Sequence, residues 1–217
     1  MQSQLVDTGS FAARATSAGG TTGVYARKTL SAAQIDLYYR IHFNVISMAA
    51  NTFNLMKFRT AANVSILSVS INNLGNLSYH NDITGTSVNT TTPVGLGAWQ
   101  SLEVHLHIAD TSSVIETWYN GSPVAAMTRT DSFGANPTGI LQLGENTPGM
   151  TYDVAYDDVA ADTGMLSANA PLAVYPASPQ AKTASPLGRL ISLAAPLTTT
   201  LVLAAFRKVS RRHGMYT

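Results

Sequence analysis

The stretch Trp99–Ala125, WQSLEVHLHIADTSSVIETWYNGSPVA, decides the fold class of this chain. Its first part alternates apolar and polar side chains with the period of two that is typical of a half-buried β-strand. Asn120-Gly121 then follows a second such run and is a strong hairpin signal, because a type I′ turn needs positive φ at both central positions. The apolar members of the first run are Leu102, Val104, Leu106 and Ile108.

Similar short runs occupy the rest of residues 1–162. They include Tyr39–Val45, Leu67–Ile71, Ile140–Gly144 and Thr151–Ala161, with turn-rich pieces between them. Short strands spaced by about 8–14 residues, without a long helical period, indicate an antiparallel sandwich or jelly roll. The segment Leu30–Asp36 is the one place where a helical turn is expected.

Three stretches resemble concanavalin-A-like lectin/glucanase domains, the laminin-G-like jelly rolls. They are residues 99–125, residues 141–161 (LQLGENTPGMTYDVAYDDVAA) and residues 9–16 (GSFAARAT). The resemblance covers residues 9–162 and implies an all-β, antiparallel two-sheet jelly-roll sandwich. Such domains usually open with a further strand, for which this chain has no room, so we expect an N-terminally truncated sequence.

Composition and charge exclude several classes of protein. The chain of 217 residues has no cysteine, which excludes a disulfide scaffold, a thiolate zinc site and a cysteine nucleophile. Only 12% of its residues are charged. The net charge of +1 combines −4 over residues 1–188 with +5 over residues 189–217. The basic end has no interleaved aromatic residues, which argues against a nucleic-acid partner.

The C-terminal part predicts a stalk and a membrane anchor. Residues 163–188 contain four prolines, which prevent a continuous helix and indicate a linker. In residues 189–217, the segment Leu190–Phe206 has no charge and precedes a basic cluster, as in a short membrane-spanning helix with a cytoplasmic C-terminus. We therefore expect an extracellular domain, residues 1–162, anchored to the membrane by its C-terminus; the alternative is a buried amphipathic helix or a frayed tail.

Two polar strand faces are candidate ligand sites. Tyr38, Arg40 and His42 alternate with apolar residues, and such a set suits a sugar-binding cleft or a lyase in which Arg neutralises a uronate. The second face, a polar run on the strand that decides the fold, can chelate a transition metal or can simply be the wet side of an amphipathic strand. Trp118 is either a stacking platform or a packing residue. The residues of the second face are Glu103, His105 and His107.

The densest acidic cluster predicts calcium. Asp153, Asp157 and Asp158 offer the hard oxygen ligands that calcium prefers. Strict alternation places Asp158 on the face of the larger apolar side chains, where a carboxylate needs a partner. The resemblance implies a structural calcium held by an Asp of this strand and by carbonyls near the start of the domain. A hydrogen bond at a turn is the alternative.

The predicted function is a non-catalytic carbohydrate-binding or adhesive module of a cell-surface protein, with a glycan or a surface protein as partner. The alternatives are a polysaccharide lyase or glycoside hydrolase of the same fold, or a structural spacer. The chain lacks the Glu-x-Asp-x-x-Glu run of related β-glucan hydrolases. A pair of carboxylates from Glu103 and Glu116 on consecutive strands stays open, because opposed side chains lie about 5 Å apart.

Overall fold

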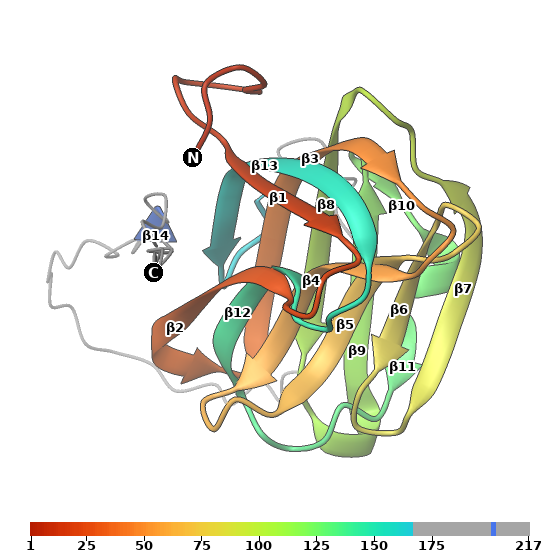
Figure 1. Cartoon of the computed structure of the whole chain (residues 1–217). Helices are drawn as coiled ribbons and strands as arrows, with labels where there is room; N and C mark the ends of the chain where they lie inside the picture. The colour runs from red at the N-terminus through yellow and green to blue at the C-terminus, as the bar shows by residue number, and fades with distance from the viewer. Residues whose placement is uncertain (167–200, 203–217) are drawn as a thin grey trace, which may run out of the picture.

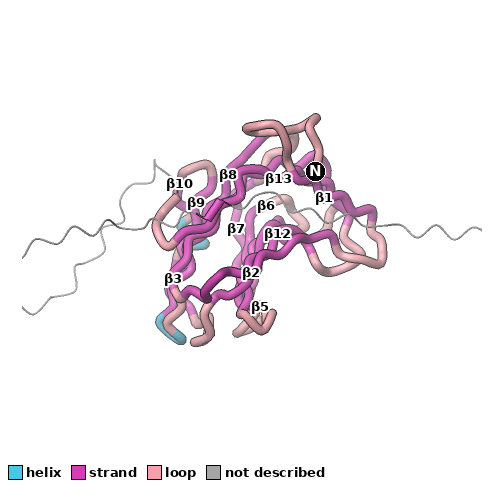
Figure 2. Tube along the Cα trace, turned by 90° about the vertical axis from the view of Figure 1, so that its left-hand side faces the viewer, coloured by secondary structure: helices cyan, strands magenta, loops and turns pink. Residues whose placement is uncertain are grey.

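The protein is a sandwich of two antiparallel β-sheets packed face to face (Figures 1 and 2). The computed structural model describes residues 1–166 and 201–202. The only helical segments of the described part are two short 3-10 turns, η1 (Asp110–Ser112) and η2 (Ala125–Met127). The expected all-β, two-sheet architecture is confirmed.

One sheet has eight strands, of which six follow one another in hydrogen-bonded order. β11 (Arg129–Asp131) pairs with β9, and β14 (Leu201–Val202) pairs with β13. The ordered strands are β1 (Ala13–Ala18), β13 (Thr151–Asp162), β3 (Asp36–Met48), β8 (Trp99–His107), β9 (Ser113–Tyr119) and β10 (Ser122–Pro123).

The other sheet has six strands and lies in front of the first in Figure 1. Four of its strands, β4 to β7, are consecutive in the chain and in the sheet and are joined by short turns, so they form a simple meander. In sheet order the strands are β2 (Val24–Gln34), β12 (Thr138–Glu145), β4 (Phe53–Thr60), β5 (Ser65–Ile71), β6 (Asn76–Asn81) and β7 (Thr86–Pro93).

Aromatic side chains hold the two sheets together. Tyr39 of β3 meets Phe58 of β4 edge to face, with ring centroids 5.7 Å apart. Phe53 of β4 stacks on Tyr152 of β13 at 4.7 Å. All four side chains are buried, and each pair joins one sheet to the other, so the alternation of the sequence becomes a continuous core.

One local prediction was wrong, and the predicted hairpin is present with a short second strand. Leu30–Asp36 is not a helical turn, because Val24–Gln34 forms β2 at the edge of the six-stranded sheet and β3 begins at Asp36. The hairpin at Asn120-Gly121 is present, with φ of 50° and 76°, but its second strand is only Ser122–Pro123. Proline cannot continue a hydrogen-bonded ladder, and the chain turns into η2 instead.

The predicted linker and anchor fall almost wholly outside the described residues. The strands of the sandwich end at Asp162, and residues 163–166 follow without regular structure. Of the predicted helix 190–206 only Leu201–Val202 is described, as the short strand β14. Among the described residues we find no helix with the length and apolarity that a membrane span requires. The stalk, the anchor and the extracellular location stay predictions.

Candidate functional site

A row of polar side chains crosses the six-stranded sheet from one edge to the other. Each member pairs in register with the next, so the six Cα positions are aligned across six strands. Their side chains lie on the outer face, because the residues before and after them on the central strands belong to the core. The row is Arg27, Gln142, Lys57, Ser68, His80 and Ser87.

A second polar row runs beside the first. Asn54, Ser70, Ser78 and Asn89 pair in sequence across β4 to β7. The hydroxyls of Ser70 and Ser78 are 3.0 Å apart. Glu145 extends this row onto β12, since its Oε2 accepts hydrogen bonds from the backbone and the side-chain amide of Asn54.

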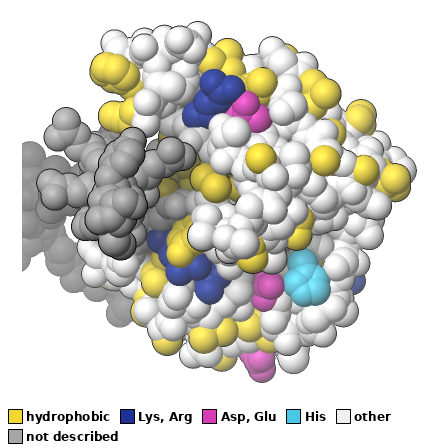
Figure 3. Space-filling view, viewed as in Figure 1, with side chains coloured by type: hydrophobic (Ala, Val, Ile, Leu, Met, Phe, Trp, Pro, Cys, Tyr) yellow, Lys and Arg dark blue, Asp and Glu magenta, His cyan; other side chains and the backbone are white. Residues whose placement is uncertain are grey.

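The second row and the part of the first row from Lys57 to Ser87 line a pocket of about 520 Å³ on this face, and Arg27 and Gln142 continue the first row beyond it. Its walls are formed almost entirely by hydroxyl, amide and charged side chains, among them Lys57, His80, Asp82 and Asn89. Figure 3 shows the same face, with one group of Lys and Arg side chains toward β2, a second group near the top of the view, and a histidine farther across the sheet from the first. The pocket therefore offers many hydrogen-bonding groups at the sheet surface.

Burial changes the electrostatics of the cationic end. Desolvation lowers the pKa of Lys57 below its ordinary value of 10.5. The carboxylates Asp82 and Glu145 oppose this shift, and Arg59 and Arg27 add smaller contributions that lower the pKa further. Desolvation, followed by repulsion from Arg27, also lowers the pKa of Arg59. Three cations thus act on one another at this end of the face, which we call the cation cluster (Arg27, Lys57 and Arg59).

Neutral groups hold the two arginines of the cation cluster. Arg27 donates from Nε to Oε1 of Gln142 at 2.9 Å and lies over the ring of Tyr25, 4.5 Å from its centroid. Arg59 donates to Oδ1 and to the backbone oxygen of Asn63, at 2.8 and 2.6 Å. Asn63 has a φ of 65°, so a left-handed turn presents both of its oxygens to the guanidinium.

The seven ligand-binding residues predicted from the sequence lie on the opposite side of the molecule. They share the outer face of the eight-stranded sheet, on β3, β8 and β9, so the structure brings the two predicted polar faces together. Their ligand role stays a prediction. They are Tyr38, Arg40, His42, Glu103, His105, His107 and Trp118.

His105 is the centre of this face. Its ring stacks on Tyr38 at 4.1 Å, and Tyr38 in turn stacks with Trp118 at 6.3 Å. Its Nδ1 is 2.7 Å from Glu116 and its Nε2 is 2.5 Å from Asp36, so carboxylates engage both nitrogens. Burial, with these carboxylates and Glu103, raises the pKa of Tyr38. His105 therefore has no nitrogen left for the His-x-His chelate considered from the sequence.

The chain after β13 returns over this face. Oε1 of Glu103 accepts a hydrogen bond from the backbone N–H of Leu166 at 2.7 Å, and Arg40 donates to the backbone oxygen of Leu166 at 2.8 Å. Glu103 is only 1% exposed. It pairs in register with Trp118, while Glu116 pairs with His105, so the two glutamates considered for hydrolysis are not directly opposed.

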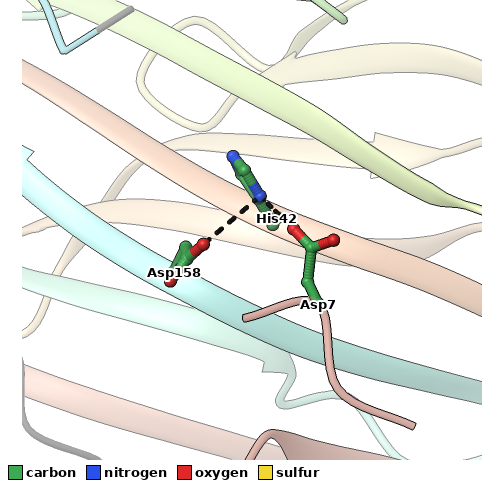
Figure 4. Close-up of side chains that lie close together, drawn as sticks. All are labelled: Asp7, His42 and Asp158. Carbon is green, nitrogen blue, oxygen red and sulfur yellow. Dashed lines mark hydrogen bonds and ion pairs between the residues drawn. The ribbon is translucent and has the colours of Figure 1, made fainter. Parts of the chain in front are cut away.

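A third site joins the two ends of the domain. Asp7, His42 and Asp158 offer ligand atoms that all lie within 4.8 Å of one another (Figure 4). His42 Nδ1 is 2.5 Å from Asp7 Oδ2 and 3.6 Å from Asp158 Oδ2. Asp158 does not lie with the apolar residues of β13, as alternation predicted, because the register shifts between Asp157 and Ala160 and φ of Asp158 is 42°.

Asp157 positions this site from behind. Its Oδ2 accepts hydrogen bonds from the backbone N–H groups of Asp7 and Thr8, at 3.0 and 3.2 Å, and its Oδ1 accepts one from Asp158. The Thr8 hydroxyl donates to Asp158 Oδ1 at 2.8 Å. Of the two predicted metal ligands, Asp158 lies in the cluster, whereas Asp157 fixes the N-terminal loop that brings Asp7 to it.

Several solved structures share this architecture. "Cellulose induced protein, Cip1" superposes with a TM-score of 0.61 at 17% identity, over 75% of this chain and 84% of that chain. A Trypanosoma rangeli sialidase, in complex with a difluorinated 2-keto-3-deoxy sugar acid, gives 0.53 at 14% identity, over 68% of this chain. The match covers 25% of the sialidase. A pentraxin from Limulus polyphemus gives 0.50 at 15% identity, over 71% of this chain and 76% of that chain.

The fold is a concanavalin-A-like jelly roll. This confirms the fold expected from the three resembling stretches. No protein-family profile matches the sequence, and no curated protein matches it significantly. Identities of this size establish the fold alone, so the function has to be argued from the sites.

Sequence reasoning missed the pocket. Ser68 and Ser70 were seen to alternate with apolar residues, but nothing local shows that they adjoin Lys57 or His80. The signal in the sequence is the run Phe53–Thr60, FNLMKFRT, in which the cations Lys57 and Arg59 stand among Phe, Leu and Met residues. Asp7 was also missed, since it stands in a loop with no pattern of its own.

Proposed function

We propose that this protein binds a glycan in the pocket of the six-stranded sheet. The observation that carries the proposal is the row of hydrogen-bonding side chains that crosses all six strands, from Arg27 to Ser87. Sugars present hydroxyls over an extended surface, and a floor of hydroxyl, amide and imidazole groups can bond to them at several points. Tyr25, 47% exposed beside Arg27, adds an aromatic ring on which a sugar can stack.

The fold comparisons are compatible with this proposal. The sialidase structure carries a sugar acid, and the name of Cip1 refers to induction by cellulose. Both statements concern those proteins. For this chain the pocket supplies the argument, since its described walls are polar and lie on a sheet face rather than inside the core.

Binding should be measured on the full chain with a panel of neutral and acidic polysaccharides by affinity electrophoresis and calorimetry. His80→Ala removes a row member inside the pocket, and His107→Ala removes a half-exposed histidine of the other sheet. We expect His80→Ala to weaken binding by about tenfold, the value of one lost hydrogen bond, and His107→Ala to leave it unchanged. The reverse result would move the site to the eight-stranded sheet, as first predicted from the sequence.

A second candidate is a lyase or hydrolase acting in the same pocket. It is favoured by the presence there of His80, Asp82, Glu145 and Lys57, which include both acidic and basic groups. Release of reducing ends or of unsaturated sugars from any polysaccharide that binds would support it. Binding without product formation supports the non-catalytic module. A chain that neither binds nor cleaves any of the polymers would be a structural spacer.

We also propose a divalent cation at Asp7, His42 and Asp158. The two carboxylates suit calcium, the cation expected from the sequence, whereas an imidazole nitrogen is more typical of transition metals. The residues therefore fit a divalent cation in general, with calcium relying on further oxygen atoms. Thermal melting after chelation, followed by return of calcium, zinc or manganese, tests this: no change in melting with any ion would remove the proposal.

A further inference from the structure

We infer that the pocket selects an anionic glycan, whose carboxylate or sulfate group lies against the cation cluster of Arg27, Lys57 and Arg59. The inference rests on the proposed glycan-binding function and names the class of ligand. It is carried by three cations at one end of the polar row, none of which forms an ion pair with a carboxylate of the described residues.

The pairing of β2 and β4 with β12 brings the three cations close together. Arg27 and Lys57 pair in register with Gln142 from its two sides, so they are separated by a single strand. Arg59 follows Lys57 by two residues on β4. Like charges held this close, two of them buried, are unfavourable unless a counter-charge is present.

Within residues 1–166 and 201–202, no carboxylate forms an ion pair with any member of the cluster. The arginines bond to the neutral oxygens of Gln142 and Asn63. The Lys57 side chain has no hydrogen bond or ion pair within this part of the chain, although the residue is only 8% exposed and lines the pocket. Its ammonium is not among the fully buried polar atoms, so a ligand in the pocket can reach it, as expected of a ligand-binding cation.

The two carboxylates of the pocket are engaged elsewhere. Asp82 Oδ2 accepts hydrogen bonds from the hydroxyls of Ser65 and Ser68, at 2.9 and 2.6 Å. Glu145 accepts from Asn54 and from the backbone N–H of Thr147, the latter at 2.6 Å. Both carboxylates act on Lys57 through space, but neither forms an ion pair with it in the described residues. An anion from outside can reach the cations without displacing an internal ion pair.

An acidic group of the ligand would accept hydrogen bonds from Lys57 and Arg27 and provide the counter-charge of the cation cluster. Lys57 can donate to one oxygen from the floor of the pocket, while Arg27, fixed by Gln142 and by the ring of Tyr25, retains guanidinium N–H groups for a second. A hexuronate or a sulfated sugar has this acidic group next to hydroxyls, which the serines and amides of the rows can bind. A neutral sugar would leave Lys57 buried without a partner.

The test uses the full chain and matched polymers. Polygalacturonate and its fully methyl-esterified form share one backbone and differ only in charge, and dextran sulfate and dextran form the corresponding sulfate pair. We expect each charged polymer to bind about tenfold to a hundredfold more tightly than its neutral counterpart, the range for a charge-assisted hydrogen bond, with weaker binding in high salt. Tighter binding of polygalacturonate identifies a carboxylate ligand, and tighter binding of dextran sulfate a sulfate ligand.

Variants assign the effect to the cluster. Lys57→Met keeps the length of the side chain without its charge and should remove the preference for charged polymers, as should Arg27→Gln in a half-buried site. Arg129→Met removes an exposed cation of the eight-stranded sheet and should have no effect. Lys57→Arg should retain the preference.

The outcomes separate the two levels of the argument. Equal binding of charged and neutral polymers, or an undiminished preference in Lys57→Met, overturns the anionic ligand and leaves the proposed glycan pocket standing. Failure of every polymer, charged or neutral, to bind overturns the proposed function as well.

Discussion

Lys57→Met should make the protein more stable, although it changes a buried residue of a central strand. The ammonium of Lys57 is desolvated and has no ion pair in the described residues; attraction to Asp82 and Glu145 and weaker repulsion from Arg59 and Arg27 act on it through space. Methionine fills nearly the same volume and needs no counter-charge. The structure therefore predicts that the substitution removes an unfavourable term rather than a contact.

The size of the effect follows from three contributions. Replacing a buried charge by an apolar side chain of similar volume is neutral or stabilises by about 1–4 kcal/mol. Lys57 and Arg27 are two strand spacings apart, about 9.6 Å, which corresponds to about 0.4–1.7 kcal/mol of repulsion for effective dielectric constants between 80 and 20. The attraction to Asp82 and Glu145, which is larger than this repulsion, is lost as well, so the gain comes from relieving the desolvation of the ammonium. We expect a net stabilisation of about 1–2 kcal/mol, or roughly 2–8 °C in melting temperature.

The pH dependence gives an independent check. Because the folded pKa of Lys57 lies below its unfolded value of 10.5, the unfolded state binds more protons between these two values, and stability rises with pH in that window. The advantage of Lys57→Met should therefore be full at pH 7 and shrink as the pH approaches 10.5. Urea denaturation at several pH values measures it, with Arg129→Met as the exposed control. A variant about 1 kcal/mol less stable than the wild type would refute the reasoning, since the ammonium would then have a stabilising partner.

Three further substitutions test other contacts. Arg14→Gln should lower stability at neutral pH and lose its effect in acid, because Arg14 lowers the pKa of Asp153 below 3.8. The stabilising contribution of this pair is present above pH 3.8 and disappears as the pH falls through the folded pKa of Asp153. Urea denaturation at a series of acidic pH values would show the loss. Gly144→Ala should lower the free energy of unfolding by about 2 kcal/mol or more, because φ of Gly144 is 83° and a Cβ would lie 2.6 Å from a carbonyl oxygen of β2. The control Gly149→Ala, at φ 86° in open space, should lower it less in the same denaturation assay. Glu103→Ala should increase hydrogen exchange and proteolysis of residues 163–166, whereas Glu103→Gln, which keeps an acceptor oxygen, should change them little; equal effects would contradict the contact.

The sandwich could be predicted because short stretches of sequence are enough to specify its strands and turns. Alternation at Leu102–Ile108 and at Leu67–Ile71 specifies strands with one buried face, and Asn120-Gly121 specifies a turn through its positive φ values. The short edge pieces could not be predicted in the same way. Leu30–Gln34 becomes a strand because β12 pairs with the β2 strand that contains it, and that contact joins residues more than a hundred positions apart.

The sites depend on long-range register, which no local pattern carries. Arg27, Gln142 and Lys57 are unrelated in the sequence until β2 and β4 pair with the two edges of β12. Asp158 was recognised as a candidate ligand, but its partner Asp7 comes from the opposite end of the domain, and its outward direction comes from a register shift in β13. The polar faces of β3 and β8 were each recognised, while their union on one sheet was not.

The return of the chain over β3 and β8 places Leu166 and the pocket on different faces of the domain. At Leu166 the backbone is held by Glu103 and Arg40 on the outer face of the eight-stranded sheet, whereas the pocket opens on the six-stranded sheet. Leu166 and the pocket therefore lie on opposite faces of the sandwich, so a contact made at one of them leaves the other uncovered.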